Sequence, residues 1–436
     1  MGGSPSRALL RDASDAATSG KTELQWSSRG LLPVVPPTFV ATLLGSSLTD
    51  VDLSGNSITQ LPASFGQLVA LERLSIDRNQ LTELPYSFYK LVNLRALDAS
   101  HNQLTHLLPT FCQLASLERL WLQHNQLTAL PDEFGHLTAL HSVYVQNNLI
   151  TALPVSIVLL PVLEVLDTSD NKLTRLPEEW NTTHRLKTLR LARNGINELP
   201  AGLGHCTTIE TLSLQSNRLV EIPKSFRALI NMHNLGLSSN RIGDFQALSG
   251  MIHLHVLTYT QNRLERVDAT LFTLTHLVYL DLSENGLTDL PPTPDETDTT
   301  TTTAGWASLV ALQELHLANN KLSHLPLGLE TLPAMKFLDV VNNVLDEISP
   351  LMGSLKTLET VWLQGNKLKT LPSEINGWTK LSTLLLDRND LEALPSSFLS
   401  LRGLSTLSID RKSFALLEPD IVRFCSALPA FELFGL

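Results

Sequence analysis

A repeat of 23 residues constrains the fold of this chain more than any other feature of its sequence. The pattern LxxLxLxxNxLxxLP recurs in sixteen units, whose first apolar positions run from Leu48 to Leu404. Two units depart from this length, because the ninth has 22 residues and the eleventh has 35. Self-similarity at a fixed period indicates a solenoid, in which each unit buries its apolar side chains against its neighbours.

The spacing inside one unit predicts a short strand followed by a return segment. In LERLWLQHNQLTALP, residues 117–131, Leu120 and Leu122 are two positions apart and therefore share one side of a strand. Trp121 lies between them and should point to the opposite side. A return segment such as LTELPYSFYKL, residues 81–91, carries its Phe and Leu back to the same interior. We expect neighbouring strands to pair in parallel along one side of the solenoid.

An asparagine follows the strand in fifteen of the sixteen units, and Lys412 stands at that position in the last one. A buried bend leaves backbone groups without partners, and a side-chain amide offers both donors and an acceptor. We therefore interpret the column as a structural ladder between units, not as a catalytic feature. Its members are Asn56, Asn79, Asn102, Asn125, Asn148, Asn171, Asn194, Asn217, Asn240, Asn262, Asn285, Asn320, Asn343, Asn366 and Asn389.

These leucine, asparagine and Leu-Pro positions resemble the intracellular leucine-rich-repeat family. The 23-residue form is similar to the Ras-group repeats of plants and to animal Ras-pathway scaffold repeats, and the resemblance covers about residues 48–412. It implies an α/β fold, a curved horseshoe with a parallel sheet on the concave face and short helical or extended turns on the convex face. It also implies protein binding on the concave face, with a small GTPase or a phosphatase as partner.

The pattern divides the chain into four parts. Residues 1–30 are expected to be a flexible tail, and residues 31–47 a degenerate repeat that caps the array. The repeat domain spans 48–412 and carries a Thr-rich loop insertion at 292–308. A second cap, at 413–436, should contain a short helix that begins near Pro419, because proline suits the first position of a helix.

Composition narrows the class of partner. The chain has 32 Lys and Arg against 43 Asp and Glu, a net charge of −11, so we expect no nucleic-acid binding. The three cysteines are far apart and have neither metal-ligand nor disulfide spacing, so no metal site is expected. The first residues lack the apolar core of a secretory signal, and a cytoplasmic monomer is the expectation. Catalytic and cofactor motifs are also missing, so we predict a non-enzymatic protein without a cofactor.

Outward-facing positions supply the candidate binding residues. One cluster surrounds the aromatic pair and comprises Arg73, Arg119, Trp121, Gln123, Tyr144 and Gln146. A second, more apolar group comprises Tyr279, Phe337, Val341, Trp362 and Leu385. Large aromatic rings beside arginine are typical of interface anchors, although such rings can also simply stack and cover the sheet.

Five aspartates share these outward columns. They are not adjacent in strand order, so we interpret them as solvated positions that attract a basic partner and not as an acid–base pair. They are Asp52, Asp98, Asp167, Asp281 and Asp339.

Together these features predict a protein–protein interaction scaffold in intracellular signalling. The alternative is a regulatory subunit that docks on an enzyme and controls it, and a third reading is an interaction module of a longer catalytic chain. The first residues, MGGSPS, fit the N-myristoylation pattern at Gly2, which would allow reversible membrane contact.

Overall fold

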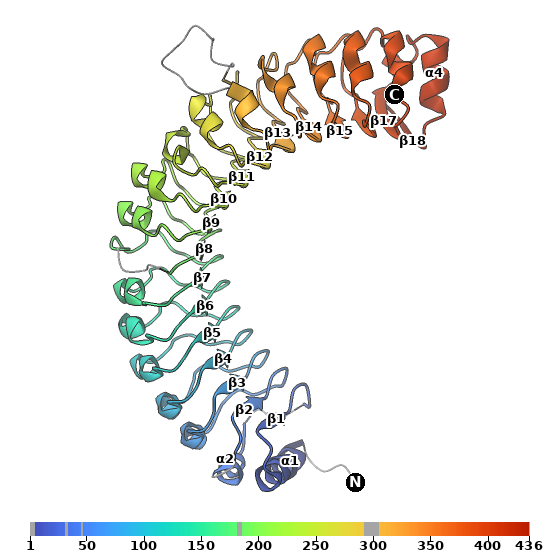
Figure 1. Cartoon of the computed structure of the whole chain (residues 1–436). Helices are drawn as coiled ribbons and strands as arrows, with labels where there is room; N and C mark the ends of the chain where they lie inside the picture. The colour runs from blue at the N-terminus through green and yellow to red at the C-terminus, as the bar shows by residue number, and fades with distance from the viewer. Residues whose placement is uncertain (1–4, 31–33, 45–46, 181–184, 292–304, 436) are drawn as a thin grey trace. The chain divides into compact units, whose positions relative to one another are not determined.

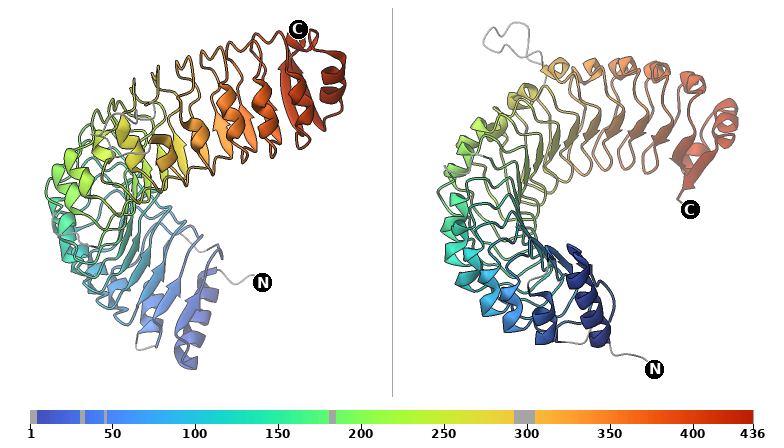
Figure 2. Two further views of the ribbon diagram at one scale, coloured as in Figure 1. Left: turned by 45° about the horizontal axis from the view of Figure 1, so that its top comes forward. Right: turned by 60° about the horizontal axis from the view of Figure 1, so that its bottom comes forward.

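The computed structural model describes residues 5–30, 34–44, 47–180, 185–291 and 305–435. The chain forms two units, residues 1–217 and 218–436, and each is described by itself. Within each unit the strands follow one another in chain order and lie on the inner side of the coils, with the 3-10 turns on the outer side (Figures 1 and 2).

The described residues of the first unit form two α-helices and nine strands. The helices are α1 (Pro5–Ser19) and α2 (Pro37–Leu43). The strands are β1 (Glu23–Gln25), β2 (Asp50–Asp52), β3 (Arg73–Ser75), β4 (Ala96–Asp98), β5 (Arg119–Trp121), β6 (Ser142–Tyr144), β7 (Val165–Asp167), β8 (Thr188–Arg190) and β9 (Thr211–Ser213). The 3-10 turns are η1 (Ala63–Gln67), η2 (Tyr86–Lys90), η3 (Pro109–Gln113), η4 (Asp132–His136), η5 (Val155–Leu159) and η6 (Ala201–His205).

The second unit continues the same pattern. Its strands are β10 (Asn234–Gly236), β11 (Val256–Thr258), β12 (Tyr279–Asp281), β13 (Glu314–His316), β14 (Phe337–Asp339), β15 (Thr360–Trp362), β16 (Thr383–Leu385), β17 (Thr406–Asp410) and β18 (Ala430–Phe434). The 3-10 turns are η7 (Lys224–Ala228), η8 (Gln246–Leu248), η9 (Ala269–Thr273), η10 (Gly305–Ser308), η11 (Leu329–Thr331), η12 (Pro350–Ser354), η13 (Ser373–Gly377) and η14 (Ser396–Ser400). The helices are α3 (Arg411–Phe414) and α4 (Pro419–Ser426).

One coil shows why the repeat folds this way. Leu120 and Leu122 are fully buried on the core side of β5, as the spacing predicts. His124 then adopts a left-handed conformation with φ of 56°, which turns the chain away from the strand. Pro131 caps the following 3-10 turn with φ of −58°, and Phe134 of that turn returns to the core. The strand pairs in parallel with both neighbours.

The asparagine ladder predicted from the sequence is confirmed. The Nδ2 of Asn79 donates to the carbonyl oxygen of Leu53 in the preceding coil and to that of Ile76 in its own coil, both at 3.0 Å. Its Oδ1 accepts a hydrogen bond from the backbone N–H of Ile58 at 3.0 Å. The same pattern recurs down the column, so each asparagine joins two successive coils.

The prediction of a flexible tail over residues 1–30 is wrong for its described part. The helix α1 buries Leu9 and Ala13, and the indole Nε1 of Trp26 donates to Asp12 Oδ2 at 3.1 Å. Strand β1 pairs in parallel with β2. The segment thus forms the first coil of the array, and α2 lies in its return segment, within the cap expected at 31–47.

At the other end, the short helix expected near Pro419 is present as α4, with Ile421 and Cys425 buried. The sequence did not indicate β18, which follows this helix and pairs in parallel with β17. Where the asparagine column ends, Asp410 Oδ2 accepts a hydrogen bond from the backbone N–H of Asn389 at 3.1 Å.

The insertion predicted at 292–308 lies mostly outside the described residues. On either side of it, β12 and β13 pair directly, with Tyr279 opposite Glu314 and Asp281 opposite His316. The sheet of the second unit therefore continues without a break across the insertion.

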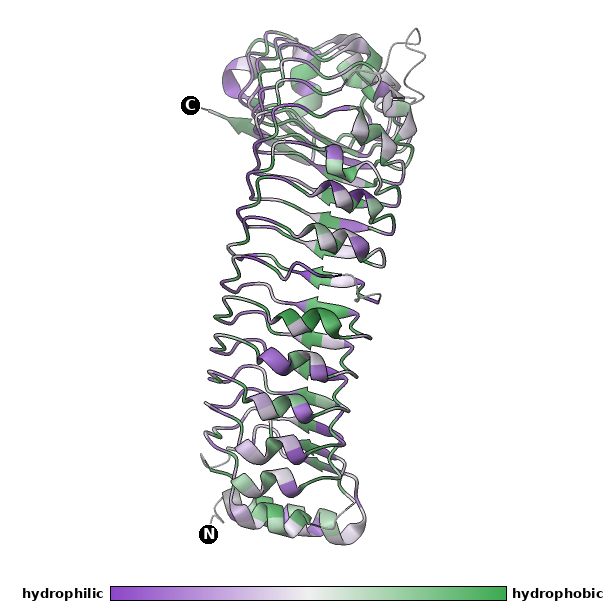
Figure 3. Cartoon of the chain, turned by 90° about the vertical axis from the view of Figure 1, so that its left-hand side faces the viewer, coloured by the Kyte–Doolittle hydropathy of each residue, from purple (hydrophilic) through white to green (hydrophobic). Residues whose placement is uncertain are grey.

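On the outer side, most turns contain both apolar and polar residues (Figure 3). The turn η5 is the most apolar of those in the first unit, and its Val155 and Leu159 are 70% and 58% exposed.

Candidate functional site

The candidate site is the strand face of each unit, which carries the side chains at the first, third and fifth positions counted from the first residue of each strand. Trp121 and Tyr144 lie opposite each other on β5 and β6 of this face. Their rings are stacked, with centroids 6.1 Å apart and planes inclined by 2°. Both are half-buried, whereas Leu120 and Val143 point into the core. The predicted orientation of Trp121 is therefore confirmed.

Polar groups border this aromatic pair. Gln123 and Gln146 are half-buried, and within the described part of the chain neither Oε1 atom has a hydrogen-bond partner. Arg119 is exposed beside Trp121 on β5. Adjacent strands thus bring together large rings, buried carbonyl oxygens without a partner and a guanidinium.

Arg73 was predicted to lie with this cluster, but the structure places it elsewhere. It is on β3, two strands from β5, and its Nε donates to Asp50 Oδ1 on β2. The hydrogen bond and the charge of Asp50 raise the pKa of the exposed Arg73 guanidinium. Arg73 therefore pairs with a carboxylate of its own unit.

In the second unit, four rings lie in a row across β12 to β15. The centroids of Tyr279 and His316 are 5.0 Å apart, those of His316 and Phe337 4.7 Å, and those of Phe337 and Trp362 4.8 Å. Leu385 follows on β16, opposite Trp362. The structure thus brings together the predicted residues Tyr279, Phe337, Trp362 and Leu385, and adds a histidine that the sequence analysis did not single out.

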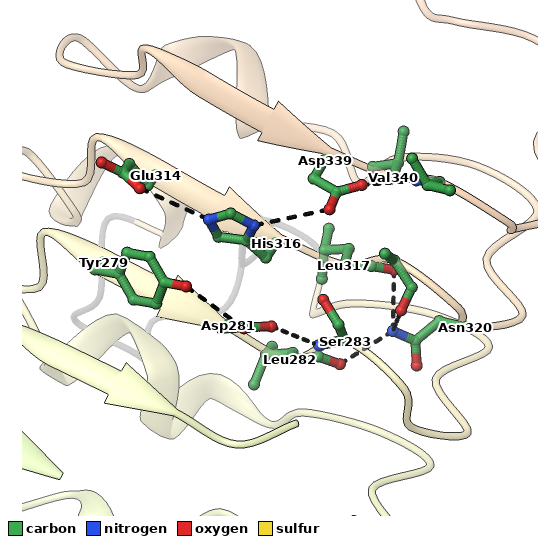
Figure 4. Close-up of polar contacts among 12 residues, drawn as sticks. Tyr279, Asp281, Leu282, Ser283, Glu314, His316, Leu317, Asn320, Asp339 and Val340 are labelled. Carbon is green, nitrogen blue, oxygen red and sulfur yellow. Dashed lines mark hydrogen bonds and ion pairs between the residues drawn. The ribbon is translucent and has the colours of Figure 1, made fainter. Parts of the chain in front are cut away.

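His316 lies between two carboxylates in this row (Figure 4). Its Nε2 is 3.7 Å from Glu314 Oε2, and its Nδ1 is 3.7 Å from Asp339 Oδ2. Burial lowers the pKa of His316, but the contact with Asp339 and the charges of Asp281 and Glu314 outweigh burial and raise it above its ordinary value. Across the row, Tyr279 Oη is 3.5 Å from Asp281 Oδ2. Burial and these carboxylates raise the pKa of Tyr279 to about 12.

The aspartates of the strand face have a structural role that the sequence analysis missed. Asp281 Oδ1 accepts a hydrogen bond from the backbone N–H of Ser283, and Asp339 Oδ1 accepts one from Val341, both at 3.0 Å. The same bond recurs at Asp52, Asp98 and Asp167. A signal was present in the sequence, because an aspartate two residues before a bend commonly caps a backbone N–H. One oxygen of each carboxylate is therefore occupied by a backbone N–H.

Two further features of the described residues bear on function. No group of three or more His, Cys, Asp or Glu side chains in them is arranged to hold a metal ion. None of their helices has the length and apolar character needed to cross a membrane. Gly2, the predicted acylation site, lies outside the described residues.

Family models and solved structures identify the fold. Leucine-rich-repeat models match residues 46–104, 115–157, 276–295 and 311–332. No curated protein matches the sequence.

Three solved structures illustrate the likeness. A leucine-rich-repeat protein of Leptospira interrogans has 28% identity and a TM-score of 0.79, with 98% of each chain covered. The functional domain of InlJ from Listeria monocytogenes has 21% identity and a TM-score of 0.66, covering 93% of this chain and 82% of that one. The Arabidopsis receptor kinase HAESA, solved with the peptide hormone IDA and the co-receptor SERK1, has 23% identity and a TM-score of 0.67, covering 97% and 75%. This protein is therefore a leucine-rich-repeat solenoid, with a parallel sheet on the strand face of each unit.

Proposed function

We propose that the protein is a non-enzymatic scaffold that binds other proteins on its strand faces. The observation that carries the proposal is the stacked pair of Trp121 and Tyr144, half-buried on the side of the sheet away from the core. Partly exposed rings of this size bury a large apolar surface when a partner binds to them. Trp and Tyr are also frequent binding hot spots.

The surroundings of the pair support the same proposal. The Oε1 atoms of Gln123 and Gln146 are buried without a partner within the described residues, so a bound protein that reorients these side chains can supply the missing donors. Arg119 adds a cation at the rim of the rings. Arginine, tryptophan and tyrosine around a desolvated centre are the usual composition of an interface anchor. The complexes of HAESA and of Toll, the latter solved with Spatzle, show that similar solenoids bind peptide or protein ligands.

A double variant, Trp121→Ala/Tyr144→Ala, tests the proposal. Proteins captured from lysate by the wild-type chain are identified, purified and titrated against the wild type and the variant. The matched control is Tyr86→Ala/Tyr89→Ala, which removes an aromatic pair from η2 on the outer side. We expect affinity to fall at least about 100-fold in the first variant and less than about threefold in the control, in line with hot-spot truncation. Equal binding by both variants would overturn the role of the strand face.

The narrower expectations rest on the resemblance and are proposals as well. We propose an intracellular signalling role, with a small GTPase or a phosphatase as partner. The alternative of a regulatory subunit is tested by measuring phosphatase and GTPase activity of the purified partner with and without this chain. A change in kcat on binding would favour the regulatory subunit, and unchanged activity the scaffold. Labelling with a myristate analogue, with Gly2→Ala as control, tests the acylation site and membrane contact.

A further inference from the structure

The strand face of the second unit has an uncompensated negative charge. Across β10 to β17, the face positions defined above include five carboxylates and no lysine or arginine. The carboxylates are Asp281, Glu314, Asp339, Asp387 and Asp410. Outside these positions, the Nε of Arg388, which follows β16, lies 3.9 Å from Asp387 Oδ2.

In the first unit, by contrast, arginines on the strand face accompany its carboxylates. Arg73 bonds to Asp50, and Arg190 Nη1 is 3.8 Å from Asp167 Oδ2 on the neighbouring strand. On the following strand, the equivalent neighbour of Asp281 is His316, and that of Asp339 is Trp362. The second unit therefore has the carboxylates of this arrangement without its arginines.

In three of these carboxylates, those of Asp281, Glu314 and Asp339, an oxygen makes only long contacts. Asp281 and Asp339 each use Oδ1 for a backbone N–H, and their Oδ2 atoms are 3.5 Å from Tyr279 Oη and 3.7 Å from His316 Nδ1. Glu314 Oε2 makes only a 3.7 Å contact with His316 Nε2, and the Glu314 side chain is 49% exposed. Contacts of this length are weaker than ordinary hydrogen bonds, so a stronger donor can replace them.

The neighbouring rings favour the same kind of ligand. A cation is attracted to the face of an aromatic ring, and a guanidinium can stack on the ring while it bonds to a carboxylate. Tyr279 and Phe337 flank His316, with the carboxylates beside them on β12 to β14. A planar cation can thus contact rings and carboxylates together, which suits arginine better than lysine.

We propose that Tyr279, Asp281, Glu314 and Phe337, with the surrounding strand face, bind an arginine side chain in a basic segment of a partner protein. The inference rests on the proposed function, because it names the chemistry of a partner for one of the two strand faces. His316 acts as the internal competitor, since its protonated ring occupies the carboxylates that the arginine needs.

This competition makes binding depend on pH. The titratable groups that face His316 are Tyr279 and Asp281 of β12, Glu314 of its own strand and Asp339 of β14. The pKa of His316 is raised, so its ring becomes positively charged as the pH falls through that value. Binding of the arginine peptide should then weaken, because the charged ring competes with arginine for the carboxylates.

The test uses the full chain and a fluorescein-labelled peptide, Gly-Ser-Arg-Gly-Ser-Arg-Gly-Ser, followed by fluorescence anisotropy at low ionic strength. The comparison peptide carries citrulline at both arginine positions and keeps the shape without the charge. The variant is Asp281→Asn/Glu314→Gln, in which asparagine can still accept the bond from Ser283. The control, Asp346→Asn/Glu265→Gln, changes the net charge equally at exposed positions off the strand face.

We expect saturable binding of the arginine peptide, at least about tenfold weaker in the Asp281→Asn/Glu314→Gln variant and less than about twofold weaker in the control. The citrulline peptide should bind at least about tenfold more weakly than the arginine peptide. If both variants weakened binding equally, the effect would come from net charge alone and the proposal would be overturned. Equal binding of the citrulline and arginine peptides would also overturn it. If the arginine peptide does not bind while Trp121→Ala/Tyr144→Ala still loses a partner, the inference fails and the proposed function stands.

Discussion

Replacing Asn125 by alanine should strongly destabilise the array, although this residue is not part of a candidate binding surface. Its Nδ2 donates to the carbonyl oxygens of Ala99 and Leu122, both at 3.0 Å, and its Oδ1 accepts from the backbone N–H of Leu104 at 2.9 Å. Asn125 is only 8% exposed. Bulk water therefore has little access to the groups that lose their partner.

The three lost bonds do not cost the same. The Leu104 N–H loses its acceptor inside the protein, and an unsatisfied buried donor costs about 1–3 kcal/mol. Each carbonyl keeps a second asparagine, because Asn102 still donates to Ala99 O at 3.2 Å and Asn148 to Leu122 O at 3.0 Å. These two losses are ordinary net hydrogen bonds, worth about 1 kcal/mol each. The free energy of unfolding should therefore fall by about 4 kcal/mol.

The change can be measured by urea unfolding, followed by tryptophan fluorescence, together with hydrogen exchange of the Leu104 amide. Exchange is needed because repeat arrays can open locally, and a global midpoint can then underestimate the loss. The matched control is Gln126→Ala, an exposed neighbour whose backbone N–H still donates to Leu104 O at 2.9 Å. Equal midpoints for the two variants, with the Leu104 amide as protected as in the wild type, would refute the reasoning.

Three further predictions concern packing and titration. Gly66→Ala should cost about 1–3 kcal/mol, because its Cβ would lie 2.1 Å from the carbonyl oxygen of Ser87. Gly243→Ala, whose nearest contact is at 3.8 Å, should be nearly neutral when both variants are measured by urea unfolding. The raised pKa of His316 should stabilise the fold below pH 6.5 and lose this effect as the pH rises through the folded-state value. The pKa of His316 can be measured by NMR titration of its ring protons, which are assigned by their absence in the His316→Gln variant. A measured pKa at or below 6.5 would contradict the prediction. Burial raises the pKa of Cys112 to about 12, so its thiol should react with a maleimide only after the chain unfolds. Rapid labelling of Cys112 in the native chain, detected by mass spectrometry, would disprove this.

The sequence was sufficient for features that repeat from coil to coil. The core positions of Leu120 and Leu122, the ladder bonds of Asn79 and the outward position of Trp121 all follow from the spacing within one unit. Each coil packs on the next coil with the same residue positions, so the sequence of one repeat predicts these contacts in the other repeats. The helix α4 was also predictable, because its start depends on the local chemistry of Pro419.

Features that occur once depend on which side chains the stacking brings together. The first coil was missed because Arg29 stands where a ladder asparagine would be, although its backbone N–H still bonds to Asn56 Oδ1 at 3.1 Å. The pairing of Arg73 with Asp50 was not foreseen, because Asp50 is 23 residues away and becomes its neighbour only through the register of β2 and β3.

His316 depends on the tertiary structure in the same way. Its carboxylate neighbour Asp339 and ring neighbour Tyr279 lie on two different strands, one of them beyond the insertion. The period of the sequence thus determines which face each residue occupies. The side-chain pairs and the charge balance on that face depend on which variable residues the stacking brings next to one another. The repeated residues do not make these contacts.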